Sequence, residues 1–343
     1  MKTINLCLVG FGNVGRAFAR LILNKEKQLE NEHQIKLQVT AIATSRHGQA
    51  LDVNGLDIRQ VITLVEKGEC IQPLSRESDI GGSMDLIERS QAQVMLENTP
   101  VNYASGQPAL DHIRHALRLG MHAITANKGP VLHAYRELTA LAGEHDRRFL
   151  FESTVMDGAP IFSLFRCALP AIHLSGFEGI LNSCTNLLLE RMDGGETLDQ
   201  AVDYARSIGI TETDPSGDID GWDAAIKVAI LVNVLMDSPL KLGEVHREGI
   251  REIPLEDIRQ AKQEGMRWKL VCRAKRDGDQ VTASVTPEKV RSDSPLFSVK
   301  GTSSFIQFKT DGLPGLGILE SDPGPETTAY GLLCDLLSIV VEK

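Results

Sequence analysis

Apolar runs alternate with amphipathic segments along the first half of the chain. Residues 4–10 form an apolar run that stops at glycine, which predicts a buried strand leading into a tight turn. The next apolar side chains recur every three or four positions, the spacing of one helical face: Val14, Ala17, Phe18, Leu21 and Ile22. The sequence therefore predicts a strand followed at once by a helix that packs on the sheet.

The same alternation continues to about residue 126. Residues 37–43 and 94–97 predict two further strands, and residues 109–119 predict a helix that leads into a strand over residues 122–126. Strands that alternate with helices in this order are typical of a parallel, doubly wound sheet. We predict an α/β fold with a Rossmann-type sheet in this part of the chain.

The pattern changes past about residue 150. Residues 172–189 are rich in strand formers, and residues 198–208 and 221–235 have helical patterns. A stretch rich in Pro and Gly at residues 312–325 predicts loops around a short strand, and residues 327–341 predict a final helix. These elements indicate a second domain of the α+β type.

Composition narrows the class of protein. With 343 residues, 42% of them hydrophobic and 24% charged, the chain has the makeup of an ordinary globular protein of two domains. The net charge of -10 argues against nucleic acids and anionic membranes as partners and favours a small-molecule substrate. The six cysteines lie far apart, and we find no C-x-x-C pair, signal peptide or membrane-spanning run. We expect a cytoplasmic protein without a zinc site or a disulfide framework.

The segment Gly10-Phe-Gly-Asn-Val-Gly15 matches the G-x-G-x-x-G pattern between a predicted strand and a predicted helix. Gly10 would permit the turn, Gly12 would let backbone N–H groups approach a pyrophosphate, and Gly15 would let the helix pack close to the strand. We predict a dinucleotide site whose residues here are Gly10, Gly12, Asn13, Val14 and Gly15. A glycine-rich turn without a ligand is the less favoured alternative.

Cofactor preference depends on the residues after the second strand, where a carboxylate would bind the ribose 2′-OH of NAD. This chain has Thr44-Ser45-Arg46 there, with no carboxylate. A hydroxyl and a guanidinium suit a 2′-phosphate, so we predict NADP, with NAD as the alternative. The alternative interpretation of Arg46 is an ordinary solvated charge in a loop, without a role in cofactor binding.

Two charged residues stand in a helix that is otherwise apolar on nearly every side. Residues 222–235 predict a buried helix, yet Asp223 and Lys227 share one of its faces. A local surface ion pair, which contributes roughly 0.2–0.5 kcal/mol, is the plain alternative. Because buried charges are costly and seldom retained for stability alone, we interpret the pair as part of a functional site.

Lys128 follows the predicted strand over residues 122–126 at its carboxyl end, where ligands bind in open parallel sheets. A lysine in a surface loop is the alternative interpretation. If Lys128 and Lys227 face one pocket, each disfavours the charge of the other, and the pKa of at least one falls. A proton acceptor near neutral pH requires such a lowered pKa.

These segments together resemble the homoserine dehydrogenase family over nearly the whole chain. Besides residues 10–15 and 212–227, the likeness rests on Glu97-Asn-Thr-Pro-Val-Asn102, Thr125-Ala-Asn-Lys-Gly-Pro130, Phe151-Glu-Ser-Thr-Val155, Gly179-Ile-Leu-Asn-Ser-Cys-Thr-Asn186 and Gly324-Pro-Glu-Thr-Thr-Ala329. The resemblance implies reversible, NAD(P)-dependent hydride transfer between L-aspartate 4-semialdehyde and L-homoserine, in threonine and methionine biosynthesis. We expect a dinucleotide-binding domain at residues 1–150, a substrate-binding and dimerisation domain at residues 151–323, and a C-terminal helix at residues 324–343 that packs back on the first domain.

The resemblance also implies a role for each group of site residues. The catalytic residues are Lys128, Lys227 and Asp223. The amino-acid pocket comprises Glu212, Asp218, Asn182, Ser183, Cys184 and Thr185. The cofactor site adds Ser45, Arg46, Thr99, Pro100, Lys128 and Gly324 to the glycine motif. A monovalent cation, expected to be sodium, lies near Glu152, Val155, Asp157 and Ala159, and the protein is a homodimer built through the second domain's sheet.

Two departures from the family pattern leave the substrate open. Asn182-Ser-Cys-Thr-Asn186 stands where the family typically has Asn-Gly-Thr-Thr-Asn, and Ile210 stands where many members have tyrosine. The alternatives are a related dehydrogenase for another small semialdehyde or amino acid, and a nucleotide-binding homologue without turnover. A nucleophilic role for Cys184 is disfavoured because no histidine lies close in sequence. His112 and His115 are interpreted as a helix surface.

Overall fold

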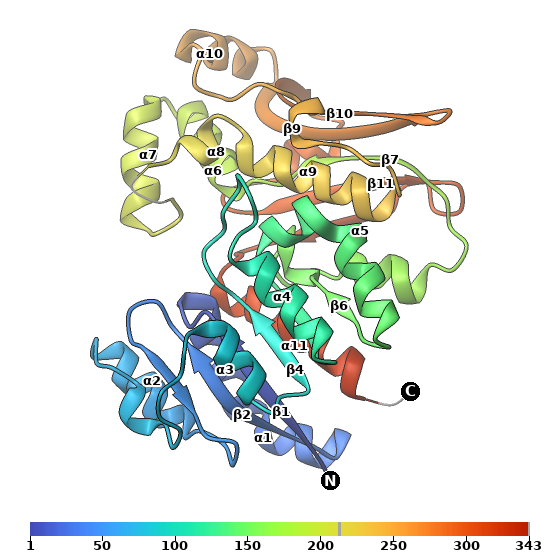
Figure 1. The fold of residues 1–343 in the computed structure, drawn as a ribbon. Coiled ribbons are helices and arrows are strands. Elements are labelled where there is room, and N and C mark those ends of the chain that lie inside the picture. The colour runs from blue at the N-terminus through green and yellow to red at the C-terminus, as the bar shows by residue number, and fades with distance from the viewer. Residues whose placement is uncertain (212–213, 342–343) are drawn as a thin grey trace. The chain divides into compact units, whose positions relative to one another are not determined.

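The computed structural model describes residues 1–211 and 214–341, which form two compact units (Figure 1). Unit 1 comprises Met1–Pro160 together with Gly324–Lys343, and unit 2 comprises Ile161–Pro323. Each unit contains a six-stranded sheet. The C-terminal segment of the chain therefore belongs to the same unit as the N-terminal half.

The sheet of unit 1 has the strand order β3-β2-β1-β4-β5-β6. Its strands are β1 Lys2–Val9, β2 Ile35–Ala43, β3 Gln49–Leu51, β4 Val94–Glu97, β5 His122–Thr125 and β6 Phe149–Leu150. Neighbouring strands are parallel except β3, which pairs antiparallel with β2 at the edge. The strand order changes direction between β1 and β4, so their carboxyl ends border the crevice where such sheets bind ligands. The predicted Rossmann-type fold is confirmed.

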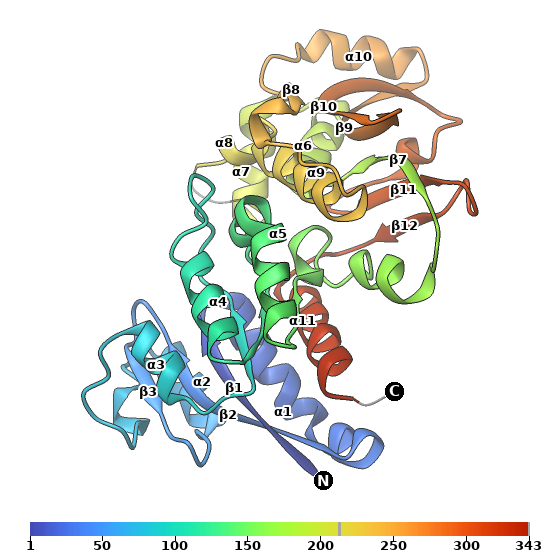
Figure 2. The same cartoon turned by 45° about the vertical axis from the view of Figure 1, so that its right-hand side comes forward.

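Helices cover this sheet and supply its core. They are α1 Asn13–His33, α2 Ile58–Glu66, α3 Ser83–Arg89, α4 Ala109–Arg118, α5 Lys128–Glu144 and α11 Pro325–Val340, with 3₁₀ turns at Gln72–Leu74 and Glu152–Thr154. As the helical spacing predicted, α1 buries Phe18 and Ile22. The C-terminal helix α11 packs beside α1 (Figure 2) and adds Leu332 and Leu336 to the core that contains Leu6 of β1.

Unit 2 is built on a mixed sheet of order β12-β11-β7-β9-β10-β8. The strands are β7 Leu174–Ile180, β8 His246–Arg247, β9 Met266–Asp277, β10 Gln280–Arg291, β11 Ser304–Thr310 and β12 Gly317–Glu320. The helices are α6 Ser183–Asp193, α7 Leu198–Ser207, α8 Ser216–Ile219, α9 Trp222–Leu235 and α10 Leu255–Gln263, with short turns at Leu164–Ala168, Leu242–Glu244 and Pro295–Ser298. Neighbouring strands pair antiparallel except β8 with β10. Helices α6 and α9 contact the long strand β9 and bury most of their apolar side chains.

One expectation needs correction here. The strand-forming segment at residues 172–189 contains only the strand β7, and from Ser183 onward it is the helix α6. The change occurs at Asn182, whose side-chain oxygen accepts a hydrogen bond from the Thr185 N–H at 2.8 Å and caps the helix. The leucines that follow are strong helix formers, so the capped segment continues as a helix.

Helix length and cysteine pairing add two plain findings. Within residues 1–211 and 214–341, no helix combines the length and the apolar character needed to cross a membrane. The six cysteines are all free, and Cys7, Cys184 and Cys272 are buried.

Candidate active site

The glycine motif forms a turn that needs glycine at two positions for packing and leaves space at the third. Gly10 has φ of +92°, and a Cβ there would lie 2.4 Å from the backbone carbonyl of Asn98. A Cβ on Gly15 would lie 2.6 Å from the Gly10 carbonyl oxygen, so the start of α1 could not approach the turn. At Gly12 no atom of the described residues lies within 4 Å of a Cβ position. This open side is the space that a pyrophosphate needs.

The first turn of α1 suits an anion. Gly12 is the N-cap, no side chain caps the helix, and the first turn contains no acidic residue. Asn13 accepts a hydrogen bond from the Arg16 guanidinium at 2.8 Å, which brings a positive charge to the same turn. Uncapped N–H groups and the helix dipole both favour phosphate.

The loop after β2 is held by Thr44, which leaves its neighbours exposed. The Thr44 hydroxyl accepts from the His47 N–H at 2.7 Å and lies 3.0 Å from the Gly48 carbonyl oxygen. Ser45 and Arg46 are exposed at the tip of this loop. Their placement at the carboxyl end of β2 is compatible with a contact to the adenosine end of a dinucleotide.

Lys128 begins the helix α5 at the carboxyl end of β5. Asn127 caps this helix by accepting from the Gly129 N–H at 2.9 Å. The same Asn127 donates to the Thr99 carbonyl oxygen at 3.0 Å, which ties the loop after β4 to the start of α5. Lys128 is half-buried there, and the sequence prediction of a position at the sheet's ligand edge agrees with this geometry.

Gly324 and Pro100 are the remaining predicted cofactor residues. Gly324 is the N-cap of α11, and its N–H donates to the Thr327 hydroxyl at 2.8 Å. Pro100 is exposed in the loop after β4.

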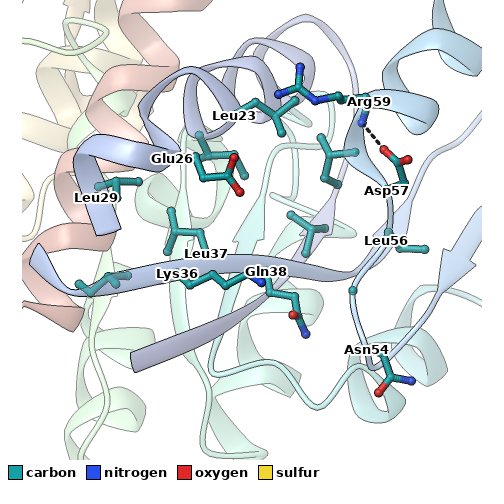
Figure 3. Close-up of a pocket in the computed structure, with 15 residues that line it drawn as sticks. Leu23, Glu26, Leu29, Lys36, Leu37, Gln38, Asn54, Leu56, Asp57 and Arg59 are labelled. Atoms are coloured by element: carbon teal, nitrogen blue, oxygen red, sulfur yellow. Dashed lines mark hydrogen bonds between the residues drawn. The ribbon is translucent and has the colours of Figure 1, made fainter. Parts of the chain in front are cut away.

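A separate hollow lies at the other end of this sheet. Its volume is about 300 Å³. Figure 3 shows Glu26 of α1, Leu37 at the start of β2 and Arg59 of α2 among the residues that line it. None of the predicted site residues that the structure describes lines it. Because ligands bind doubly wound sheets at the carboxyl ends of the strands, this hollow is not the dinucleotide site.

Asp223 and Lys227 of α9 form an ion pair that is mostly buried. Lys227 Nζ lies 3.2 Å from Asp223 Oδ2, and each side chain is 15% exposed. Nζ also donates to the Leu181 carbonyl oxygen at 2.7 Å, immediately before the start of α6. The pair is therefore more than a local surface contact along one helix.

Asn182 links two carboxylates beside this lysine. Its amide nitrogen donates to Asp218 Oδ1 at 2.7 Å and to Asp223 Oδ2 at 3.0 Å. Burial and the negative charge of Asp223 raise the pKa of Asp218 above its ordinary range. Two carboxylates facing one lysine leave an excess of negative charge, which would favour a substrate ammonium group.

Sequence reasoning missed one member of this cluster. The Thr211 hydroxyl donates to Asp218 Oδ2 at 3.4 Å, although a lone threonine before the acidic run carries no recognisable signal. Glu212, the expected carboxylate next to it, lies outside the described residues. Ser183 is the first residue of α6, and Thr185 is fully buried with its hydroxyl 2.9 Å from Asn182 Oδ1.

Cys184 lies in this cluster as a buried thiol. Burial and the neighbouring Asp218 carboxylate raise the pKa of Cys184 well above its ordinary value. We predict that Cys184→Ser keeps kcat within a few-fold of the parent, because a thiol that stays protonated is a poor nucleophile. Iodoacetamide labelling with peptide mapping should modify the exposed Cys70 and spare Cys184 at neutral pH. Rapid, inactivating labelling of Cys184 would contradict the prediction.

The residues expected around a cation lie in one loop of unit 1. Glu152, Val155 and Ala159 are buried, and Asp157 is half-buried with its carboxylate 3.3 Å from the Thr327 hydroxyl. Among residues 1–211 and 214–341, no three His, Cys, Asp or Glu side chains form a metal-binding group. Any cation at this loop would depend on backbone oxygens.

A buried lysine behind α6 was also missed. Lys269 of β9 is 3% exposed and donates to Asn186 Oδ1 at 2.6 Å and to the Val299 carbonyl oxygen at 2.5 Å. Asn186 in turn donates to the Gly301 carbonyl oxygen at 2.9 Å. These bonds anchor the helix whose first turn carries the polar cluster.

Lys269 should make stability depend on pH. Burial lowers the pKa of Lys269 from 10.5 to about 8, whereas the unfolded chain holds the proton up to 10.5. The free energy of unfolding should therefore rise as pH rises from 8 towards 10.5, by about 3 kcal/mol at most. Urea denaturation on both sides of pH 8 checks this, with Lys269→Met losing the rise and the exposed Lys275→Met keeping it. Equal slopes in both variants would refute the prediction.

His112 corrects the interpretation of a helix surface. It is 4% exposed, its Nδ1 lies 3.5 Å from Glu97 Oε1, and its Nε2 lies 2.8 Å from the Ser83 hydroxyl oxygen. His115 is half-buried, and its Nε2 atom is buried without a hydrogen-bond partner among the described residues.

Comparisons with known proteins cover both units of this chain. The model of the homoserine dehydrogenase NAD-binding domain matches residues 10–152, and that of homoserine dehydrogenase itself matches residues 160–337. An NAD(+)-dependent homoserine dehydrogenase from Pseudomonas canavaninivorans is 34% identical over 99% of this chain and 97% of its own. The homoserine dehydrogenase from Methanocaldococcus jannaschii is 34% identical over 98% of each chain.

Solved structures give the same result. The homoserine dehydrogenase from Thermoplasma acidophilum aligns with a TM-score of 0.83 and 27% identity over 98% of this chain and 99% of its own. A hyperthermophilic archaeal homoserine dehydrogenase in complex with NADPH aligns with a TM-score of 0.81 and 30% identity over 98% of each chain.

Proposed function

This chain belongs to the homoserine dehydrogenase family, and we propose from that premise how its residues interconvert L-homoserine and L-aspartate 4-semialdehyde. It is an NAD(P)-dependent oxidoreductase that acts on a CH–OH group. The polar cluster of unit 2 carries the proposal, because Asp218 and Asp223 are joined by Asn182 beside the ammonium group of Lys227. Such a cluster can hold an amino-acid ammonium and manage one proton.

The proton is assigned to a lysine. When bound, the nicotinamide supplies or accepts the hydride. Lys227 or Lys128 donates a proton to the substrate carbonyl oxygen in the direction of the alcohol, and a neutral lysine takes the hydroxyl proton in reverse. Asp223 orients Lys227 through their 3.2 Å contact, and Asp218 binds the substrate ammonium together with Glu212. An ammonium group beside Asp218 would favour its ionised form.

The residues present fit a dinucleotide in unit 1. Gly10, Gly12 and Gly15 with Asn13 and Val14 hold the pyrophosphate at the uncapped start of α1, where a Gly12 Cβ would meet no atom of residues 1–211 or 214–341. The other residues assigned to the cofactor are Ser45, Arg46, Thr99, Pro100, Lys128 and Gly324. The remaining lining of the substrate pocket is assigned to Ser183, Cys184 and Thr185.

One assay tests the reaction. Purified protein with L-homoserine and NADP or NAD at alkaline pH should reduce the nicotinamide at a rate that depends on homoserine. A panel of small amino-acid alcohols belongs in the same experiment, because Ser183 and Cys184 stand where family members typically have glycine and threonine. Turnover of another substrate alone would exclude homoserine and keep the reaction class, and dinucleotide binding without any turnover would exclude both.

We assign a preference for NADP to Ser45 and Arg46, which are exposed after β2. Arg46→Glu should raise KM for NADP by about 10- to 100-fold, since charge-assisted bonds contribute roughly 1.5–3 kcal/mol, and leave KM for NAD within a few-fold. The exposed Arg59→Glu, which lies at the other end of the sheet, is the control. A lower KM for NAD than for NADP in the parent protein would overturn the assignment.

Two further assignments follow from the family. A sodium ion near Glu152, Val155, Asp157 and Ala159 would be held by backbone carbonyl oxygens, because hard cations prefer oxygen ligands. Thermal unfolding in sodium chloride and in tetramethylammonium chloride at equal ionic strength tests the sodium site, and equal unfolding midpoints would exclude it.

The homodimer formed through the unit 2 sheet is tested by sedimentation equilibrium, and a monomer in that experiment would exclude the dimer. A cytoplasmic location stays a prediction.

A further inference from the structure

Two buried polar residues and one half-buried residue lie in contact behind the cofactor edge of unit 1, outside the residues assigned so far. Glu97 ends β4 and is completely buried, His112 lies in α4, and Ser83 begins α3. His112 Nδ1 lies 3.5 Å from Glu97 Oε1, and the Ser83 hydroxyl oxygen lies 2.8 Å from His112 Nε2. The elements β4, α4 and α3 thus contribute one residue each to a continuous polar network.

Glu97 holds the loop that follows it. Its Oε1 accepts from the Thr99 N–H at 3.3 Å and also from the Thr99 hydroxyl. Because the Glu97 carboxylate accepts from both the N–H and the hydroxyl of Thr99, it fixes the conformation of this turn. His112 Nδ1 lies 3.5 Å from the same oxygen, and because an ionised carboxylate can only accept, the tautomer with its proton on Nδ1 would hold the carboxylate in place.

The loop formed by Asn98 and Thr99 contacts both the glycine turn and the start of α5. The Asn98 N–H donates to the Val9 carbonyl oxygen at 2.7 Å, and the Asn98 carbonyl packs against Gly10 so closely that a Cβ there would lie 2.4 Å away. The Thr99 carbonyl oxygen accepts from Asn127, which caps the helix that begins with Lys128. A shift of Thr99 would therefore move the glycine turn and the start of α5 together.

The same loop also contains polar atoms without partners. Glu97 Oε2 and both polar atoms of the Asn98 side chain are buried and have no hydrogen-bond partner among residues 1–211 and 214–341. Buried polar groups in native proteins are nearly always paired, and exceptions gather where a ligand or ordered water completes the bonding. These three atoms are therefore available to hydrogen-bond with a polar ligand or with ordered water.

We propose that His112 and Ser83 are positioning residues for the dinucleotide: they orient Glu97, and Glu97 holds the Asn98–Thr99 loop against the glycine turn. The proposal rests on the proposed function for the identity of the ligand. A buried histidine kept only for packing would affect stability alone. A positioning residue changes the affinity for the dinucleotide and leaves the affinity for the amino acid unaltered.

The test compares His112→Phe, Ser83→Ala and the exposed His145→Phe as a matched control. Phenylalanine keeps the ring volume and removes both contacts of the imidazole. We expect at least a tenfold higher Kd for NADPH, measured by nicotinamide fluorescence, and the same rise in KM for the dinucleotide. KM for homoserine should stay within twofold in His112→Phe, with a smaller rise in Kd in Ser83→Ala. His112→Asn, which retains an N–H group, should recover part of the affinity.

The outcomes separate the two proposals. Unchanged NADPH affinity in both His112→Phe and Ser83→Ala overturns the positioning role, whatever happens to the thermal midpoint. If His112→Phe fails to fold, Ser83→Ala decides alone, because its side chain is half-buried and its loss removes one contact. If the parent protein binds NADPH and does not oxidise homoserine, the proposed reaction fails while the fluorescence comparison still tests the network.

Discussion

Replacing Lys227 by methionine should lower kcat for homoserine oxidation by about 100- to 10,000-fold, the usual contribution of a general acid–base group. Lys227 is the cation of the unit 2 cluster, placed by Asp223 at 3.2 Å and by the Leu181 carbonyl at 2.7 Å. Methionine keeps the length of the side chain and removes the transferable proton. Steady-state kinetics with saturating homoserine and dinucleotide measures the loss, and circular dichroism verifies the fold.

A second substitution separates proton transfer from charge. Lys227→Arg keeps a cation beside Asp223, but a guanidinium does not release its proton at the pH of the assay. Both variants should therefore be slow if Lys227 transfers the proton. An active arginine variant would reduce Lys227 to an electrostatic role, and near-normal kcat in the methionine variant would move the proton to Lys128, for which Lys128→Met is the next measurement. The exposed Lys27→Met serves as the control.

Two glycine substitutions should separate folding from dinucleotide binding. Gly12→Ala places a methyl group in open space, so the thermal midpoint should stay close to that of the parent while the Kd for NADPH rises at least tenfold, which is about 1.4 kcal/mol. The physical reason is that the added methyl would occupy the side from which a pyrophosphate approaches the α1 N–H groups. Fluorescence titration and thermal unfolding measure the two effects.

Gly10→Ala is the matched variant with the opposite expectation. Its Cβ would lie 2.4 Å from two backbone atoms of Asn98 at a φ of +92°, so the backbone itself must move. We expect the free energy of unfolding to fall by about 3 kcal/mol or more, since strained φ and overpacking both contribute. Unaltered NADPH affinity in Gly12→Ala would remove the pyrophosphate from this turn, and a stable Gly10→Ala protein would contradict the packing argument.

Most elements of unit 1 could be predicted from local sequence patterns. The strand β1, the helix α1 and the glycine turn between them follow from spacing of apolar residues and from backbone conformation, both of which depend on a few consecutive residues. The buried pair of Asp223 and Lys227 was likewise recognisable, because a charged stripe contradicts the apolar pattern of its own helix. The early part of unit 2 was harder, since the leucine-rich segment at residues 181–189 suits a strand as well as the helix α6 that forms.

The sequence by itself predicted the doubly wound sheet and the glycine turn. It also singled out Lys128 and Lys227 as site candidates and showed the resemblance to one family. Only the tertiary structure decided which polar residues are buried and what they contact. Ser83, Glu97 and His112 come from three elements, and Lys269 reaches an asparagine that lies 83 residues away in the chain. Burial depends on which distant segments pack together, so no local pattern distinguishes a histidine on a helix surface from one that holds a buried carboxylate.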